Sequence, residues 1–248
     1  MDRYPICYPV TSKWEGGWSD HAQDPGGKTM YGITEKRWWE YQDAKGWKRT
    51  PVRSVTPAMA VVFYRSEYWE KCGAPNLFPG VDLAIFDVSV NSGIGRGIKY
   101  RNQTNSVSKP DERVRAICRA RLSFLQSLKI WKTFGKGWGR RVADIEARGV
   151  MMALEAMGHA APSRKVEATT ATAKAQAEQK KTASAGKAAA TSTPVAGASS
   201  VTVSDHTALY IIGGLVVIGI IAALVLYARQ KAAQARADAY SSIQGEQQ

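Results

Sequence analysis

Apolar residues recur with helical spacing along several segments of the first 160 residues. Between residues 111 and 128 they stand three or four positions apart, which places them on one face of an amphipathic helix. That face is formed by Val114, Ile117, Cys118, Leu122 and Leu125. The pattern therefore predicts a helix that begins at Asp111 and packs against a core.

Three further helices are expected in the same region. Thr56 followed by Pro57 is typical of a helix N-cap with proline in the first turn, and Gly73 supplies the end of that helix. A short apolar helix is expected over residues 82–91, and another over residues 138–157. The first part of the chain is thus predicted to be mainly helical.

The stretch WEGGWSDHAQDPGGKTMYGIT, residues 14–34, has a different pattern. Its sequence Asp24-Pro25-Gly26-Gly27 is a turn signal, and the short segments on either side could pair as a β-hairpin. Glu15, next to two glycines, is expected where a helix ends in a glycine-rich turn. The predicted fold class is mainly α with a small β-hairpin, an α+β arrangement.

Beyond residue 160 the composition changes. No aromatic residue occurs between Gly139 and Leu209, and large apolar groups are what a core needs to offset the entropy of ordering the chain. We therefore expect one folded domain over residues 1–160. Residues 161–207, rich in Ala, Thr, Lys and Ser, have no apolar stripe, so they are predicted to be a flexible linker in which helix forms at most transiently.

Residues 208–228 contain no charged side chain and predict a single transmembrane helix. At 1.5 Å per residue the segment would be about 31 Å long, close to the ~30 Å hydrocarbon core of a bilayer. Tyr210 and Tyr227 stand near its two ends, where interfacial aromatic residues are common. Gly219 and Ala223 form a small-xxx-small pair, a weak signal for self-association of such helices.

The flanking charges predict the orientation of this helix. Arg229, Lys231 and Arg236 follow it within the short polar tail, residues 229–248, which favours a cytoplasmic C-terminus. The expected location is the inner membrane, with the folded domain on the periplasmic side. The first residues have no apolar run typical of a secretory signal, so the domain is expected either to cross the membrane by another route or to stay inside until the membrane fails.

The net charge of the 248-residue chain is +13, and residues 1–160 hold 25 Lys and Arg against 16 Asp and Glu. A basic domain attracts polyanions such as nucleic acid, anionic lipid or an anionic cell-wall polymer. Nucleic-acid binding would rest on charge alone and is not expected.

The cysteines Cys7, Cys72 and Cys118 lack metal-ligand spacing and are expected to be buried thiols, with one disulfide as the alternative.

Glu15 and Asp24 are the candidates for acid–base chemistry. Glycoside hydrolysis needs one protonated carboxyl group as general acid and a second, ionised one that orients water or attacks the sugar. Glu15 lies between Trp14 and Trp18, and desolvation by indole rings favours a neutral carboxyl group. Asp24 lies in a polar turn that favours its ionised form, and Thr29 is a candidate to hold the water. The alternative is a purely structural turn.

Other candidate residues carry weaker signals. Asp87 and Asn91 share a helix face, where they either contact substrate or tie this helix to the hairpin. Gly93 to Gly97 resembles a phosphate loop but lacks its Lys-Ser/Thr, so a turn between helices is expected. No metal site or cofactor is expected, because no histidine has a partner at ligand spacing. One or two tryptophans are expected to line a cleft, among Trp38, Trp39, Trp47, Trp69 and Trp138.

The order of these motifs along residues 10–150 resembles glycoside hydrolase family 108, N-acetylmuramidases of phages and bacteria with a lysozyme-like fold. The matching segments are Glu15-Gly16-Gly17-Trp18, Asp24-Pro25-Gly26-Gly27-Lys28-Thr29, Tyr31-Gly32-Ile33-Thr34, Tyr64 to Trp69, Phe86 to Gly93, and Phe134 to Val142. The resemblance implies that Glu15 is the catalytic acid, and the spacing from Glu15 to Asp24 and Thr29 is similar to the Glu-Asp-Thr arrangement of phage-type lysozymes. Tyr31, Asp87 and Asn91 are the candidate substrate-binding residues. The region 102–110 is shorter than in many members, which argues against a separate wall-binding subdomain.

The function expected from these observations is a membrane-tethered peptidoglycan hydrolase of the endolysin type. It would cleave the β-1,4 bond between N-acetylmuramic acid and N-acetylglucosamine. A lytic transglycosylase, which shares the acid and the substrate, is the first alternative. A wall-binding membrane protein without activity is the second.

Overall fold

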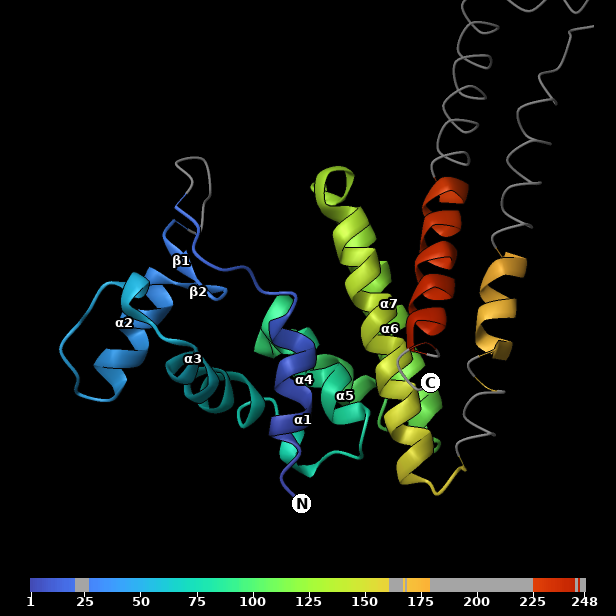
Figure 1. The fold of residues 1–248 in the computed structure, drawn as a ribbon, viewed down its shortest axis with the longest axis horizontal. Helices are drawn as coiled ribbons and strands as arrows, with labels where there is room; N and C mark the ends of the chain where they lie inside the picture. Colours follow the sequence, from blue (N-terminus) through green and yellow to red (C-terminus); the bar gives the residue numbers. More distant parts are fainter. Residues whose placement is uncertain (21–26, 161–166, 168, 179–224, 244, 246–248) are drawn as a thin grey trace, which may run out of the picture. The chain divides into compact units, whose positions relative to one another are not determined.

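The computed structural model describes residues 1–20, 27–160, 167, 169–178, 225–243 and 245 (Figure 1). These residues are mainly helical, and their one sheet has two short strands. The elements are α1 Tyr4–Ser12, β1 Thr29–Met30, β2 Ile33–Thr34, α2 Glu35–Ala44, η1 Val52–Ser54, α3 Pro57–Tyr64, η2 Arg65–Trp69, η3 Ala74–Asn76, α4 Val81–Ser92, α5 Ile94–Gln103, α6 Pro110–Ser127 and α7 Trp131–Ala156.

Contacts divide the chain into two compact units. The first comprises Met1–Phe124 and Arg148–Ala161, and it contains both strands and the helices α1 to α5. The second comprises Leu125–Ala147 and Pro162–Gln248.

Helix α4 forms the centre of the first unit. Every residue from Val81 to Ser89 is buried, and α1, α5, η2 and η3 pack around it (Figure 1). The ring of Phe86 meets the rings of Tyr4 from α1 and Trp69 from η2 edge-on, with centroids 5.8 Å and 5.4 Å away. A helix buried on all sides needs neighbours that cover it completely and pair its polar side chains.

The start of the second predicted helix is confirmed in detail. The side chain of Thr56 accepts a hydrogen bond from the Met59 amide, and Pro57 opens α3. The helix continues from α3 into the π-helix η2, and Gly73, with φ of 76°, follows it in a left-handed conformation. A π-helix within an α-helix widens one turn and often marks a functional site.

The other predicted helices are also present. Helix α4 matches the short apolar segment, and the five apolar residues of α6 are all buried. Helix α7 begins earlier than expected, at Trp131 rather than near Trp138. Only Gly93, with φ of 90°, makes the joint between α4 and α5, while the rest of the Gly93 to Gly97 segment lies in the first turn of α5.

The β-hairpin is present, but its tight turn lies after the expected position. Strands β1 and β2 pair antiparallel and are joined by the two residues Tyr31 and Gly32, both with positive φ, as a type I′ turn requires. The segments flanking the Asp24-Pro25-Gly26-Gly27 signal also pair, through two backbone hydrogen bonds of 2.9 Å between Ser19 and Thr29. Residues 21–26 lie outside the described part of the chain.

Two segments near the C-terminal end are described. Residues 169–178, inside the predicted linker, are helical, in line with the helix propensity of Ala, Lys and Gln. Residues 225–243 are also helical. None of the described helices is long and apolar enough to span a membrane. Residues 208–224 of the predicted transmembrane segment, which include Gly219 and Ala223, lie outside the described part of the chain.

Candidate active site

Glu15 lies just beyond the C-terminal end of α1. The helix ends at Ser12, and two turn hydrogen bonds, Trp14 N–H to Thr11 O at 3.1 Å and Glu15 N–H to Ser12 O at 3.0 Å, carry the backbone onward. The side chain is half-buried. The structure therefore confirms the predicted position of this carboxyl group at a helix end, and α1 is fixed by its packing on α4.

The turn of the hairpin lies directly against the Glu15 carboxyl group. A Cβ atom at Gly32 would stand 2.5 Å from Glu15 Oε2, 2.6 Å from the Tyr64 hydroxyl and 3.1 Å from the Glu15 Cβ. Only a residue without a side chain fits such a close approach, and Gly32 also has φ of 75°. The Tyr-Gly-Ile-Thr segment thus brings its backbone against the candidate acid.

Three tyrosines surround this contact. The Tyr64 hydroxyl donates a hydrogen bond of 2.8 Å to the carbonyl of Tyr31 and so ties the turn to the end of α3. The Tyr64 ring lies 5.8 Å from that of Tyr8 and stacks on that of Tyr68 at 5.4 Å. Tyr64 and Tyr68 stand on either side of the junction between α3 and the π-helix η2.

The charge of Glu15 acts on two of these tyrosines, Tyr8 and Tyr68. Burial raises the pKa of Tyr8, and the negative charge of Glu15 raises it further. Burial likewise raises the pKa of Tyr68, opposed by Arg37 and reinforced by Glu15 and Glu67. Both phenols therefore remain protonated at neutral pH, able to donate hydrogen bonds beside the carboxyl group.

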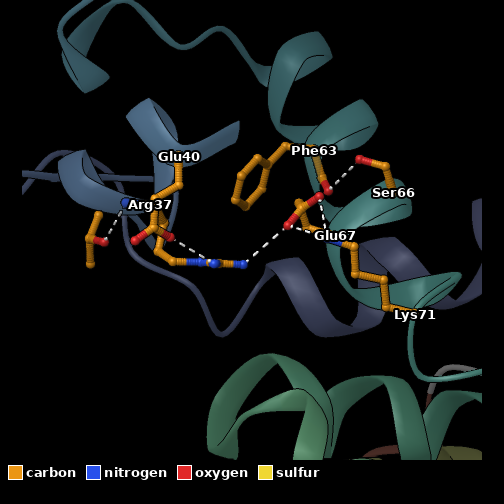
Figure 2. Close-up of polar contacts among 7 residues, drawn as sticks. Arg37, Glu40, Phe63, Ser66, Glu67 and Lys71 are labelled. Carbon is orange, nitrogen blue, oxygen red and sulfur yellow. Dashed lines mark hydrogen bonds and ion pairs between the residues drawn. The ribbon is translucent and has the colours of Figure 1, made fainter. Parts of the chain in front are cut away.

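A charged network connects α2 to η2 (Figure 2). Its Arg37 also interacts with Tyr68. Arg37 donates to Glu67 at 3.2 Å and to Glu40 at 2.9 Å, while Lys71 donates to Glu67 at 2.7 Å. The Glu67 side chain is only 14% exposed, so its pair with Arg37 is screened less than an ordinary surface ion pair. The network fixes the helix that follows the hairpin against the tyrosines that surround Glu15.

The other residues of the N-terminal motif have different surroundings. Thr29 lies in β1, where it pairs with Thr34 and Ser19, and its hydroxyl donates to the Gly27 carbonyl at 3.1 Å. Tyr31, at the turn, has φ of 51°. Asp24 lies outside the described residues.

Asp87 and Asn91 meet at one arginine. Arg121 donates to Asp87 Oδ2 at 2.5 Å and to Asn91 Oδ1 at 3.0 Å. The side chains of Asp87 and Arg121 are both completely buried, whereas Asn91 is partly exposed. Of the two roles left open by the sequence, this placement favours the structural one for Asp87, but Asp87 ties α4 to α6 and not to the hairpin as predicted.

The tryptophans divide as expected for a small domain. Trp38 and Trp69 are core residues, 2% and 1% exposed, whereas Trp47 is 52% exposed. Trp39 and Trp138 are half-buried.

The three cysteines are free and buried, as predicted. Among the described residues no cluster of three metal-ligating side chains occurs.

Sequence reasoning missed the tyrosines as members of the site. The spacing of Tyr64 and Tyr68 could have indicated that these two lie together, since residues four positions apart share a helix face. Nothing in the local sequence connects Tyr8 or Arg37 to Glu15, because these contacts depend on how α1, α2 and η2 pack.

Comparison with known proteins places the chain among glycoside hydrolases. The sequence profile of the family Glycosyl hydrolase 108 matches residues 8–93, which include Glu15, the hairpin and the three tyrosines. Among solved structures, SagA of Brucella abortus is similar, with 30% sequence identity and a TM-score of 0.53. The match covers 60% of this chain and 95% of SagA. A comparison with curated proteins gave no match.

Proposed function

Since the chain belongs to the glycosyl hydrolase 108 family and is therefore a glycoside hydrolase, we propose that it is an N-acetylmuramidase that uses Glu15 as its general acid. The substrate is peptidoglycan, and the bond cleaved is the β-1,4 bond from N-acetylmuramic acid to N-acetylglucosamine. The observation that carries this assignment is the approach of Gly32 and Tyr64 to the Glu15 carboxyl group.

The surroundings of Glu15 suit an acid that delivers its proton to a sugar. The carboxyl group is half-buried between the hairpin turn and the tyrosines, so it is partly shielded from water. In the proposed reaction Glu15 protonates the leaving glycosidic oxygen, which weakens the bond to the anomeric carbon. The phenols of Tyr8 and Tyr68 supply hydrogen bonds to Glu15 or to the sugar. Asp24 takes the second role, orienting water or stabilising positive charge on the ring, and Thr29 helps to hold that water.

The products of digestion test this function. Purified peptidoglycan would be digested with the full-length chain, with Glu15→Gln and with Glu112→Gln, and the fragments analysed by mass spectrometry. Glu112 is a suitable control because it is an exposed glutamate on α6, with 56% of its side chain accessible. We expect fragments with reducing-end muramic acid from the wild type and from Glu112→Gln. The Glu15 variant should be at least roughly 10²-fold slower, because general acid catalysis is lost.

The same measurement separates the two alternatives. Fragments that end in 1,6-anhydro-muramic acid would show a lytic transglycosylase, in which no water attacks. No cleavage by any of the three proteins, with binding to the wall retained, would show a wall-binding protein instead. Cleavage that persists undiminished in Glu15→Gln would refute the assignment of the acid.

We further propose that residues 208–228 anchor the enzyme in the inner membrane. The support is their length and the absence of charge, together with the cations that follow. The catalytic domain then lies on the periplasmic side, as in a phage or prophage endolysin that opens the wall. Fractionation of expressing cells tests this: the full-length chain should sediment with membranes, and a variant that lacks residues 208–228 should not. Equal distribution of both proteins would refute the anchor.

A further inference from the structure

The beginning of α7 carries a cluster of aromatic side chains. Phe134 and Trp138 stack with their ring centroids 5.6 Å apart, and Trp131 lies 6.3 Å from Trp138. Phe134 is 52% exposed, and so is Ile130, which stands just before the start of α7. Large apolar side chains that gather on a surface, rather than standing singly, are typical of an interaction site.

A glycine fixes the position of one of these rings. The indole of Trp131 lies over Gly135, where a Cβ atom would stand 2.5 Å from it, and reaches toward Gly139. Because no side chain stands at position 135, Trp131 lies along the helix and remains next to Trp138. The arrangement of the aromatic cluster therefore depends on Gly135, although this glycine adds no side chain to the surface.

The same turns of the helix are strongly basic. Lys129, Lys132, Lys136 and Arg140 are all exposed. No acidic residue occurs anywhere from Arg113 to Ala143. Lys129 lies in the turn just before α7. At 100° per residue the three cations within the helix, Lys132, Lys136 and Arg140, occupy the side opposite the aromatic residues. Residues 129–140 thus form a short basic aromatic segment with the two faces of an interfacial amphipathic helix.

We propose that residues 129–140 bind an anionic lipid surface, with Phe134 and Trp138 in the interfacial layer and the cations at the phosphates. The chemistry of the segment favours lipid over a wall glycan. Sugar recognition combines an aromatic ring with carboxylate and amide side chains that accept hydrogen bonds from hydroxyl groups, and residues 129–143 contain no Asp, Glu, Asn or Gln. Aromatic rings with Lys and Arg are instead the composition of membrane-surface helices. This contact is separate from the anchor at residues 208–228 and does not depend on catalysis by Glu15.

A fluorescent probe tests insertion in the full-length chain. Phe134→Cys would be labelled with an environment-sensitive nitrobenzoxadiazole dye, and Trp47→Cys, whose parent side chain is equally exposed at 52%, would serve as the matched control. The native cysteines are 0% to 1% exposed and do not compete for the label. Vesicles of phosphatidylglycerol and phosphatidylethanolamine would be compared with vesicles of phosphatidylcholine.

The expected result is a blue shift and brightening of the dye at position 134 on anionic vesicles, with no change at position 47. The signal at 134 should be largely lost when Lys132 and Lys136 are both replaced by Glu, because the attraction to phosphate is reversed. It should also weaken at ~1 M salt, where the Debye length is about 3 Å. This response reports the local segment, so it remains interpretable even if residues 208–228 hold the chain on the vesicle.

Three outcomes would overturn the proposal. The dye at position 134 could remain unchanged on anionic vesicles, or respond equally on phosphatidylcholine, or respond only to purified peptidoglycan. The last would assign the segment to the wall. Peptidoglycan cleavage by the same labelled protein is measured in parallel, so that failure of lipid binding and failure of the proposed muramidase activity are seen separately.

Discussion

Gly32 lies so close to Glu15 that a methyl group would not fit between them. The Cβ of an alanine at position 32 would stand 2.5 Å from Glu15 Oε2 and 2.6 Å from the Tyr64 hydroxyl. The hairpin turn and the carboxyl group are therefore positioned as one unit, although they belong to different local motifs of the sequence. Substitutions that disturb this unit should affect activity more than stability.

Replacement of Gly32 by alanine should displace the Glu15 carboxyl group. We expect kcat to fall by roughly 10²-fold, since misplacement of a catalytic group by about 1 Å has such an effect. Gly46→Ala is the matched control, because Gly46 has a similar φ of 69° but no neighbouring atom within 4 Å of where a Cβ would stand. Both variants should lose stability from the strained backbone, by about 1 kcal/mol. Equal kcat values for the two variants would contradict the importance of the contact.

Tyr64→Phe should loosen the turn without opening a cavity. The variant lacks the 2.8 Å hydrogen bond to the Tyr31 carbonyl, and we expect stability to fall by about 1 kcal/mol. The value of kcat/KM should fall roughly tenfold as the turn over Glu15 becomes less ordered.

Tyr100→Phe provides the comparison for this variant. Tyr100 is also a buried tyrosine, and its hydroxyl donates to the Ala120 carbonyl at 3.2 Å. A similar loss of stability with unchanged kcat/KM is expected there. If both variants lost activity to the same degree, general destabilisation rather than positioning of the turn would be the cause.

Asp87→Ala should destabilise the fold strongly. It leaves the buried guanidinium of Arg121 without its carboxylate partner, and breaking such a pair costs about 3–5 kcal/mol. Asp43→Ala is the control, because Asp43 and Arg49 form an exposed ion pair and its loss should leave the free energy of unfolding nearly unchanged. Urea unfolding followed by circular dichroism measures both. A stable Asp87→Ala with weakened substrate binding would instead support a role in the cleft.

Stability should decline in alkaline solution. Burial raises the pKa of the Cys72 thiol above its ordinary value of 9.0. Below pH 9.0 the Cys72 thiol is protonated in both the folded and the unfolded chain, so its contribution to the free energy of unfolding is fully present. Above it the unfolded chain releases the proton while the folded protein keeps it, so the free energy of unfolding falls as pH rises toward the folded pKa.

Urea unfolding between about pH 7 and pH 10 would measure this decline, and Cys72→Ala should make the slope shallower. Burial also raises the pKa of Cys7, so part of the slope should remain in that variant. An identical slope in wild type and variant would show that Cys72 has no part in it.

Much of the helical framework could be predicted from local pattern. Thr56 and Pro57 determined the start of α3, and the apolar spacing of α6 identified its buried face, because capping and periodicity are properties of adjacent residues. The end of a helix near Glu15 was predicted, but the start of α1 was not, because prolines stand in its first turn and at Pro9 in its interior. The predicted linker and transmembrane segment rest on composition, and most of their residues lie outside the described part of the chain.

The sequence by itself determined the candidate acid, since Glu15 stands in a short motif whose glycines and aromatic residues can be read directly. Only the tertiary structure decided what surrounds it. Tyr8, Tyr64 and Tyr68 reach Glu15 because α1 and η2 both pack on α4 and because the turn at Gly32 closes over the carboxyl group. Such contacts depend on packing between elements distant in sequence, which local propensity does not encode. The burial of Asp87 against Arg121 was decided in the same way.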